Sequence, residues 1–493
     1  MSIVLLESLS AWWPETILSV GALFVVLASV SIHQSAASAG KEASLAMLMS
    51  WIALVMSGIA LWYAPVPTAN APFSGLIICD PFSLAFRWIV LGVTALILLM
   101  VMGSREVSAT MRGEYLGLIL LVAVGLMVMA EANHLLMAYV GMELVSLSSY
   151  ALVGFLTDKR SAEASLKYLL FGALSSGIML FGMSLLVGLT GQLAFPELAL
   201  SIAGLTGPMA KALLVAVALM LAGLAFKISM VPFHMWTPDV YEGAPLPVAA
   251  LLSVGPKAAG LALLLRLMTA LQPAWPTLMP LLLGLTVVTM TLGNVVALVQ
   301  TNIKRLLAYS TIGQVGYLLI GATAMMTAPS GPSLGLEAIL VYLVAYLFMN
   351  LGVFACAVAV VNDTGNESLD AFRGLSQRSP GLALVCALFL LSLAGIPPLL
   401  GFFGKWLLFG SALESHHVWL AVAGAVNSAI ALYYYVNIIR LMYVSTPQRQ
   451  SALKPALALR MALGLCAVAI LAFGLFPGPL VEWLHAAAHV NLL

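Results

Sequence analysis

A small set of ionisable side chains lies inside long apolar runs of the chain. The acid is Glu143, in GMELVSL, and the bases are Lys167, Lys227, Lys257 and Lys405. A charge at the centre of a membrane helix costs roughly 3 kcal/mol, so we expect these side chains to face a bundle interior, water or one another. Lysine can release and recapture a proton as arginine cannot, and a buried Glu–Lys pair that opens and closes changes its proton affinity. These residues therefore predict a proton relay.

Two proline-containing breaks lie beside these lysines. The segment FKISMVPFHMWTPD interrupts the apolar run that carries Lys227, and SLAGIPPLLGFFGKW interrupts the run that carries Lys405. The interrupting residues are Pro232, Pro238, Gly395, Pro397 and Pro398. Proline clashes with the preceding helical turn, and unwound backbone at membrane depth is tolerated where it is buried or lines a wet cavity. Two broken helices in corresponding halves indicate an inverted-repeat transporter, and a simple packing kink is the alternative.

Other polar side chains in and near these runs allow more than one interpretation. His234 lies in the first break, where a neutral imidazole can pass a proton between Lys227 and Lys257 or simply form a hydrogen bond in the core. Lys167 follows Glu163 by four residues, so the two can form an ordinary ion pair near the surface. Arginines near the ends of apolar runs are expected to extend to the surface, namely Arg266, Arg440 and Arg460.

The composition indicates the class of protein that holds these charges. Of the 493 residues, 62% are hydrophobic and 8% are charged, and the mean hydropathy is +1.08. Soluble globular domains are about a quarter charged and under half apolar, which excludes a soluble enzyme, a nucleic-acid-binding protein and a disordered scaffold. The net charge of +1 offers no polybasic surface. A membrane span needs about 20 apolar residues, so the apolar content suffices for about 15 spans.

Motifs for redox and nucleotide cofactors are absent from the sequence. Its four cysteines stand far apart and form no CxxC or Cys/His cluster, so we expect neither an iron–sulfur cluster nor a zinc site. The sequence also lacks GxxxxGK[ST] and a strand-borne GxGxxG. We therefore do not expect this chain itself to use ATP or NADH. The cysteines are Cys79, Cys356, Cys386 and Cys466.

The apolar runs predict an all-α polytopic membrane protein with about 14 transmembrane helices and no barrel strands. Residues 1–493 are expected to form a single integral membrane domain, because the longest polar connections are loop-sized. The sixth, eighth and twelfth runs are too long for plain straight helices. The expected spans are 15–32, 44–64, 81–103, 114–131, 134–155, 162–189, 211–236, 240–270, 277–300, 305–326, 335–361, 381–412, 418–444 and 456–480.

Basic residues alternate between the loops of the two sides. With the N-terminus outside, the outside loops hold only Lys211, and the positive-inside rule then places both termini on the periplasmic side of a bacterial inner membrane or on the equivalent side of another energy-coupling membrane. No Lys or Arg precedes Lys41, so the first helix lacks the basic region of a cleaved signal peptide and is expected to be retained. The inside loops hold Lys41, Arg105, Arg112, Lys159, Arg160, Lys304, Arg305, Arg373, Arg378, Arg449 and Lys454.

Several segments closely resemble the antiporter-like membrane subunits of respiratory complex I, the NADH-quinone oxidoreductase, and its bacterial N-type members in particular. They are FKISMVPFHMWTPDVYEGAPLPVAALLSVGPKAAG, QTNIKRLLAYSTIGQVGYLLIG and SLAGIPPLLGFFGKW, with EASLKYLLFGALSSG and YLFMNLGVFA in agreement. The resemblance covers about residues 80–480. It implies a proton-conducting membrane module with two inverted five-helix repeats, here 114–270 and 277–444, and with broken seventh and twelfth helices.

The resemblance also implies roles for residues, cofactors and partners. Glu143 would pair with Lys227, Lys257 and Lys405 would continue the proton path, and Lys167 would modulate the pair. The lysine at position 405 is typical of the N-type subunits, whereas one sister subunit has a glutamate at the corresponding position. No cofactor is implied on this chain, since FMN, iron–sulfur clusters and quinone would be held by other subunits. The implied partners are the other membrane-arm subunits, including sister antiporter-like subunits, and the lipid bilayer.

Three other functions remain open from the residues alone. A subunit of a multisubunit cation/proton antiporter or of a membrane-bound hydrogenase shares the lysine pattern. A stand-alone solute permease leaves the row of lysines unexplained, and a passive membrane scaffold has no use for buried charges. The favoured hypothesis is a proton-translocating subunit that couples electron transfer from NADH to quinone to proton pumping.

Overall fold

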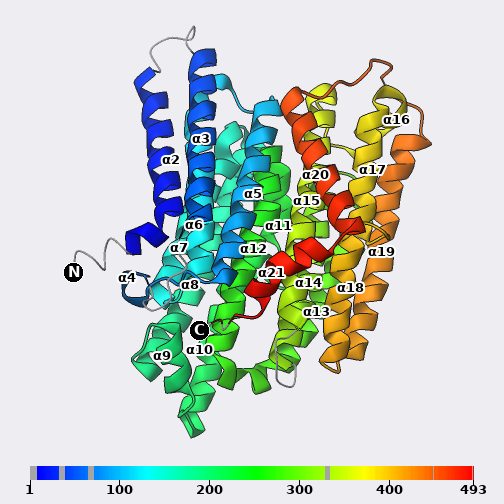
Figure 1. The fold of residues 1–493 in the computed structure, drawn as a ribbon. Helices are drawn as coiled ribbons and strands as arrows, with labels where there is room; N and C mark the ends of the chain where they lie inside the picture. The colour runs from blue at the N-terminus through cyan, green and yellow to red at the C-terminus, as the bar shows by residue number, and fades with distance from the viewer. Residues whose placement is uncertain are drawn as a thin grey trace.

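The computed structural model describes residues 8–32, 39–64, 72–327, 334–447, 449–490 and 492. Figure 1 shows the long helices side by side in one bundle, with α2 and α3 at one edge, α19 at the other and α21 lying across the face. The helices are α2 (Trp13–Ile32), α3 (Ala39–Trp62), α4 (Pro72–Gly75), α5 (Pro81–Gly103), η1 (Ala109–Met111), α6 (Arg112–Glu131), α7 (Leu135–Val153), η2 (Gly154–Leu156), α8 (Lys159–Thr190), α9 (Phe195–Ile202), α10 (Gly207–Ile228), α11 (Trp236–Gly243), α12 (Leu246–Ala270), η3 (Gln272–Ala274), α13 (Trp275–Ala297), α14 (Ile303–Thr327), α15 (Leu334–Thr364), η4 (Leu369–Phe372), α16 (Leu375–Arg378), α17 (Pro380–Ala394), α18 (Leu400–Glu414), α19 (Val418–Tyr443), α20 (Leu457–Leu475) and α21 (Gly478–Ala488).

The all-α polytopic architecture is confirmed. Within the described residues, 13 helices are long and apolar enough to cross a membrane, and the shorter apolar helix α17 adds to them. The same residues contain only isolated β-bridges in place of strands. The described chain is therefore a multi-pass helical membrane protein.

One expectation about long helices is wrong and two are confirmed. The sixth run forms α8, a single helix of 32 residues. It contains no proline, and it is capped by the Asp158 side chain at its start and by left-handed Gly191, with φ of 69°, at its end. At 1.5 Å per residue it is about 48 Å long, so it extends beyond the hydrocarbon core. The eighth run divides into α11 and α12, and the twelfth into α17 and α18.

Both predicted breaks occur where the chain enters a left-handed turn. Ser229, with φ of 64°, ends α10, and Gly395, with φ of 90°, ends α17. The chain resumes as α11 at Trp236 and as α18 at Leu400. Each break therefore leaves a helix end and its unpaired backbone groups inside the bundle, where a polar side chain can meet them.

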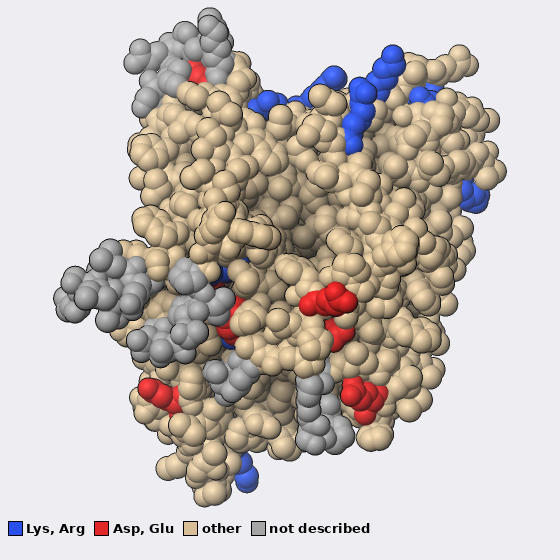
Figure 2. All heavy atoms as spheres, viewed as in Figure 1, with Lys and Arg blue, Asp and Glu red and all other residues tan. Residues whose placement is uncertain are grey.

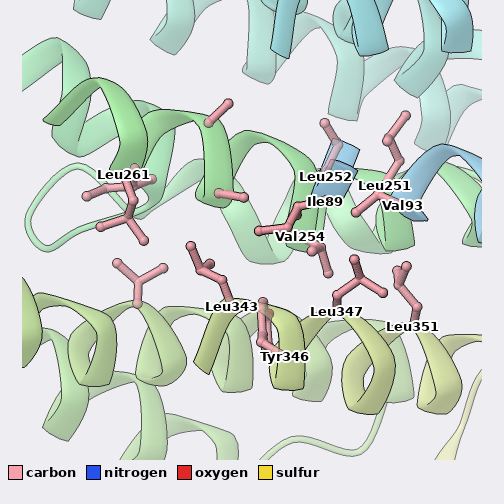
Figure 3. Close-up of a cluster of buried hydrophobic side chains, with 14 of the residues drawn as sticks. Ile89, Val93, Leu251, Leu252, Val254, Leu261, Leu343, Tyr346, Leu347 and Leu351 are labelled. Carbon is pink, nitrogen blue, oxygen red and sulfur yellow. The ribbon is translucent and has the colours of Figure 1, made fainter. Parts of the chain in front are cut away.

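The core of the bundle is formed by helices that are apolar on every side. All of the apolar window of α12 is buried, as is 89% of that of α15, whereas the corresponding figure is 33% for α2 and for α19. An apolar helix with buried surface all round belongs at the centre of a bundle. Figure 3 shows side chains of α12 and α15 facing one another beside α5: Ile89, Val93, Leu251, Leu252, Val254, Leu261, Leu343, Tyr346, Leu347 and Leu351.

Gly293 allows α13 and α14 to approach closely. A Cβ atom at Gly293 would lie 2.4 Å from the backbone nitrogen of Gly313 and 2.8 Å from the carbonyl oxygen of Tyr309. Because these are backbone atoms, we expect Gly293→Ala to destabilise the protein by about 1–3 kcal/mol, as overpacking does, and to lower Tm in detergent. Gly284→Ala on the same helix is the control, since nothing lies within 4 Å of its Cβ position. Equal Tm values for the two variants would contradict this role.

Charged side chains are distributed unevenly between the two ends of the bundle. Figure 2 shows most Lys and Arg side chains of this face near its upper rim, and the Asp and Glu side chains mainly lower. This distribution agrees with the sequence, in which basic residues are concentrated in every second loop.

Candidate functional site

Lys227 lies in the last turn of α10, immediately before the first break. Its side chain is buried, with 1% of its surface exposed. The ammonium donates to the Ser146 hydroxyl at 2.9 Å and to the Met142 carbonyl at 3.3 Å, both on α7. Lys227 is thus held in the bundle interior by neutral acceptors.

Glu143 occupies the same stretch of α7 but does not pair with Lys227 here. It is half-buried, and its Oε1 atom is buried without a hydrogen-bond partner. Among the described ion pairs none joins Glu143 to Lys227, because the ammonium bonds to the serine one turn further on. The structure therefore places the two predicted partners on facing helices in an unpaired arrangement, and their pairing stays a prediction.

Lys257 lies in the middle of α12, directly after Pro256. Its ammonium is fully buried and has no hydrogen-bond partner. It lies 4.7 Å from the centre of the Trp236 ring and 5.6 Å from that of Tyr241, so aromatic faces stabilise its charge. Trp236 is itself fixed by a hydrogen bond of 3.0 Å from its indole nitrogen to the Phe226 carbonyl. The segment that follows the first break thus forms the wall around Lys257.

Lys405 meets the helix end that the second break exposes. Its ammonium donates to the carbonyls of Leu393 and Ala394, the last residues of α17, at 3.0 and 3.2 Å. It also donates to the Ser428 hydroxyl at 2.8 Å and lies 4.5 Å from the centre of the Tyr317 ring. A cation at a helix C-terminus is favoured by the helix dipole and by the free carbonyls. The break therefore creates a binding position for this ammonium.

Two of the predicted site residues lie outside this buried group. Lys167 is 40% exposed and pairs with Glu163 at 2.8 Å, as its spacing on the helix allows, and with Asp239 at 3.0 Å. His234 is half-buried, and its Nδ1 atom is buried without a partner. No hydrogen bond of the described residues joins His234 to Lys227 or Lys257. Its relay role stays a prediction.

A polar network between α12 and α18 was not predicted from the sequence. It lies on α14 and α15, which contact both of those helices. Ser310 and Thr311 precede Gln314 on α14 by four and three residues, so each is its neighbour on the helix surface, and this spacing is the signal that could have predicted the network. The hydrogen-bonded pairs are Asn350–Ser253 at 2.6 Å, Tyr346–Thr311 at 2.9 Å, Gln314–Tyr435 at 3.2 Å, Ser310–Tyr435 at 2.5 Å and Tyr342–Gln314.

A charged cavity opens where the first turns of α8 and α14 lie beside α11. Its volume is 290 Å³, and it is lined by both signs of charge. Arg305 bonds to Asp239 at 2.9 Å and to Glu242 at 2.7 Å, and so joins α14 to α11. Deeper in this region Lys304 is buried and pairs with Glu367 at 2.6 Å. Burial alone would raise the pKa of Glu367, but Lys304 and Arg160 lower it below its usual range.

The expected surface position of Arg266 is wrong. Its side chain is fully buried and donates to both carboxylate oxygens of Asp80, at 2.8 and 3.0 Å. The helix α12 contains no acidic residue that could pair with Arg266, and Asp80 lies 186 residues away, so a buried guanidinium could not be expected from local spacing. The surface positions expected for Arg440 and Arg460 are confirmed by their exposed hydrogen bonds.

Comparison with known proteins agrees with this fold. A family model described as NADH:quinone oxidoreductase/Mrp antiporter, TM, matches residues 132–431. The NADH-quinone oxidoreductase subunit N of Anaeromyxobacter sp. is 40% identical, over 97% of this chain and 96% of the relative. The NAD(P)H-quinone oxidoreductase subunit 2 of Gloeobacter violaceus is 43% identical, over 89% of this chain and 83% of the relative.

Solved structures give the same result. A chain in respiratory complex I from Thermus thermophilus is 31% identical with a TM-score of 0.77, over 95% of this chain and 98% of that one. A chain in an archaeal membrane-bound sulfane sulfur reductase shares the fold, with a TM-score of 0.85 at 24% identity, over 97% of this chain and 96% of that one. The chain therefore belongs to the NADH:quinone oxidoreductase/Mrp antiporter family of membrane proteins.

Proposed function

We propose that this chain is a proton-translocating membrane-arm subunit of respiratory complex I, where it couples electron transfer from NADH to quinone to proton pumping. The observation that carries the proposal is the row of buried lysines formed by Lys227, Lys257 and Lys405. In the described part of the chain, each ammonium contacts only neutral groups. A buried lysine that lacks a carboxylate partner can give up its proton.

The mechanism depends on opening and closing of the Glu143–Lys227 pair. When the pair is open, as the hydrogen bond of Lys227 to Ser146 represents, Lys227 holds its proton less tightly and passes it through water toward Lys257. The proton then moves along the polar face of α14 and α15 to Lys405 and is released. Closing the pair attracts a new proton from inside. Quinone reduction elsewhere in the complex drives the change by stabilising one state over the other. His234 assists proton transfer between Lys227 and Lys257, and Lys167 modulates the Glu143–Lys227 pair.

We propose further that residues 114–270 and 277–444 form the two inverted repeats. The broken helices support this division, since each contains a left-handed turn near its middle. Isolated bridges support it as well: His134, before α7, pairs with Ala194, and Asn302, before α14, pairs with Ser368. The helices α7 and α14 occupy corresponding places in the two repeats, so the two bridges repeat one connection.

The surroundings of the chain follow from the same proposal. It lies in a bacterial inner membrane with both termini on the periplasmic side and contacts other membrane-arm subunits, including sister antiporter-like subunits. FMN, iron–sulfur clusters and quinone belong to other subunits. The second candidate is a subunit of a cation/proton antiporter, because the matching family model also names the Mrp antiporter.

The test is NADH-driven proton uptake by inverted membrane vesicles that carry Lys257→Met at the native locus. Met keeps an unbranched side chain that is one atom shorter and removes the proton-binding group, so we expect uptake to fall by about 10²-fold or more, the scale of a lost acid–base group. Lys211→Met, on an exposed position of α10, is the control with normal uptake. Normal NADH-driven uptake in Lys257→Met, with sodium-driven proton movement lost instead, would favour the antiporter.

A further inference from the structure

A second group of buried charges lies apart from the lysine row, where α2, α5 and α6 meet. Arg87 of α5 lies between Glu15 of α2 and Glu131, the last residue of α6. The exposed fractions of the three side chains are 2%, 0% and 0%. The proton path proposed above uses none of them. Figure 1 shows α2 at the edge of the bundle beside α6.

The guanidinium of Arg87 is already matched by one carboxylate. Its Nε and Nη2 atoms donate to the two oxygens of Glu15, at 2.8 and 2.5 Å, in the bidentate geometry that arginine and carboxylate prefer. Nη2 also donates to the Ala11 carbonyl at 3.0 Å, and Nη1 faces the Cys79 sulfur at 4.0 Å. Arg87 and Glu15 therefore form a complete neutral pair.

Glu131 is left without a cation of its own. Its Oε2 atom accepts from the indole nitrogen of Trp12 at 3.1 Å, which is a neutral donor. Its Oε1 atom lies 2.7 Å from Arg87 Nε, but that nitrogen donates to Glu15, and Oε1 has no hydrogen-bond donor. A buried carboxylate oxygen that accepts no hydrogen bond is costly while it carries charge, and binding of a proton removes that charge without adding bulk.

The net charge of the three side chains also favours a bound proton. Two carboxylates and one guanidinium carry a net charge of −1 if both acids are ionised, and an unmatched buried charge costs several kcal/mol. Among the described ion pairs, Arg87 is the basic partner of both acids. Two carboxyl groups that share one site do not both ionise.

We propose that Glu131 and Glu15 form a carboxyl pair that binds one proton, carried by Glu131 Oε1, as a proton-binding site separate from the lysine row. Among the described residues, the other charged and titratable groups beside it are Cys79, Asp80 and Arg266. Asp80 is already paired with Arg266 at 2.8 Å, so that pair adds no net charge. Binding of the proton joins α2 to α5 and α6, and its loss leaves a repulsive negative charge between them.

The test is infrared spectroscopy of the full-length chain in detergent at neutral pH, which detects the C=O stretch of a protonated carboxyl group. We expect a band in the wild type that is lost in E131Q. It is also lost in E15Q, because Arg87 then pairs with Glu131 and ionises it. E197Q, which removes an exposed acid of α9, keeps the band. A wild type with no band assignable to Glu131, or E15Q with the band retained, would overturn the proposal.

Thermal stability gives a second readout that does not depend on assigning a band. Because Gln is a neutral isostere of protonated Glu, E131Q is expected to keep the neutral-pH Tm of the wild type. A group that is buried in its protonated form loses stability as pH rises, so the wild-type Tm should fall more steeply toward alkaline pH than that of E131Q. A lower Tm for E131Q at neutral pH, with equal slopes, would indicate two ionised carboxylates and overturn the proposal.

Discussion

Replacing Lys227 by arginine is expected to abolish NADH-driven proton uptake through this subunit, as fully as replacing it by alanine. Arginine keeps the positive charge and can still donate to Ser146, which Lys227 contacts at 2.9 Å. It does not release its proton at any pH that a cell reaches. A role in charge or packing alone would therefore survive Lys227→Arg, whereas a role in proton transfer would not. The measurement is proton uptake by inverted vesicles, with NADH:quinone turnover followed in parallel.

The control for both Lys227 variants is Lys211→Arg, at an exposed position near the other end of α10. It should leave uptake and turnover at wild-type rates, with the complex assembled in all strains. We expect the Lys227 variants to lose about 10²-fold or more of their uptake, the scale of a missing acid–base group. If Lys227→Arg pumped normally while Lys227→Ala did not, Lys227 would be a charge that positions α7 against α10, and the relay would start elsewhere.

Helix positions were predictable from sequence because the membrane imposes a simple rule. A span needs a run of about 20 apolar residues, and the structure has its helices where those runs occur. The two breaks were also predictable, because proline and glycine interrupt a helix at their own positions, whatever the rest of the bundle does. The error at α8 came from length alone, because a run of 32 residues without proline remains one helix and projects from the membrane. The short helices α9 and α21 lie outside the predicted spans or extend beyond the last of them.

The partners of buried charges were not predictable in the same way. Arg87 and Glu15 are separated by 72 residues, and Arg266 and Asp80 by 186. Such contacts depend on how whole helices pack, and no spacing within one helix records them. The lysines were found because each stands alone in an apolar run, while Arg266, near a run's end, looked able to reach the surface. The type and position of a buried charged residue thus indicate that it needs an ion-pair partner, but the packing of the helices determines which residue that partner is.

Arg266→Leu is expected to destabilise the protein by about 3–5 kcal/mol, because it leaves the Asp80 carboxylate buried without its cation. The lost contacts are the bonds from Nη2 to both oxygens of Asp80 and bonds of 3.1 Å to the carbonyls of Ala130 and Leu492. Asp80 also caps α5 by accepting from the Ser83 backbone nitrogen at 2.7 Å, so an unpaired Asp80 weakens the start of a core helix. The measurement is Tm of the purified protein in detergent.

Two further variants separate the ion pair from mere loss of side-chain volume. Arg460→Leu removes an exposed arginine of α20 and should leave Tm unchanged. Adding Asp80→Asn to Arg266→Leu should recover part of the lost stability, since asparagine still caps α5 but carries no charge to be left unpaired. If the double variant were as unstable as Arg266→Leu, the cost would lie in the lost packing and carbonyl bonds. If Arg266→Leu matched Arg460→Leu, the buried pair would contribute nothing to stability.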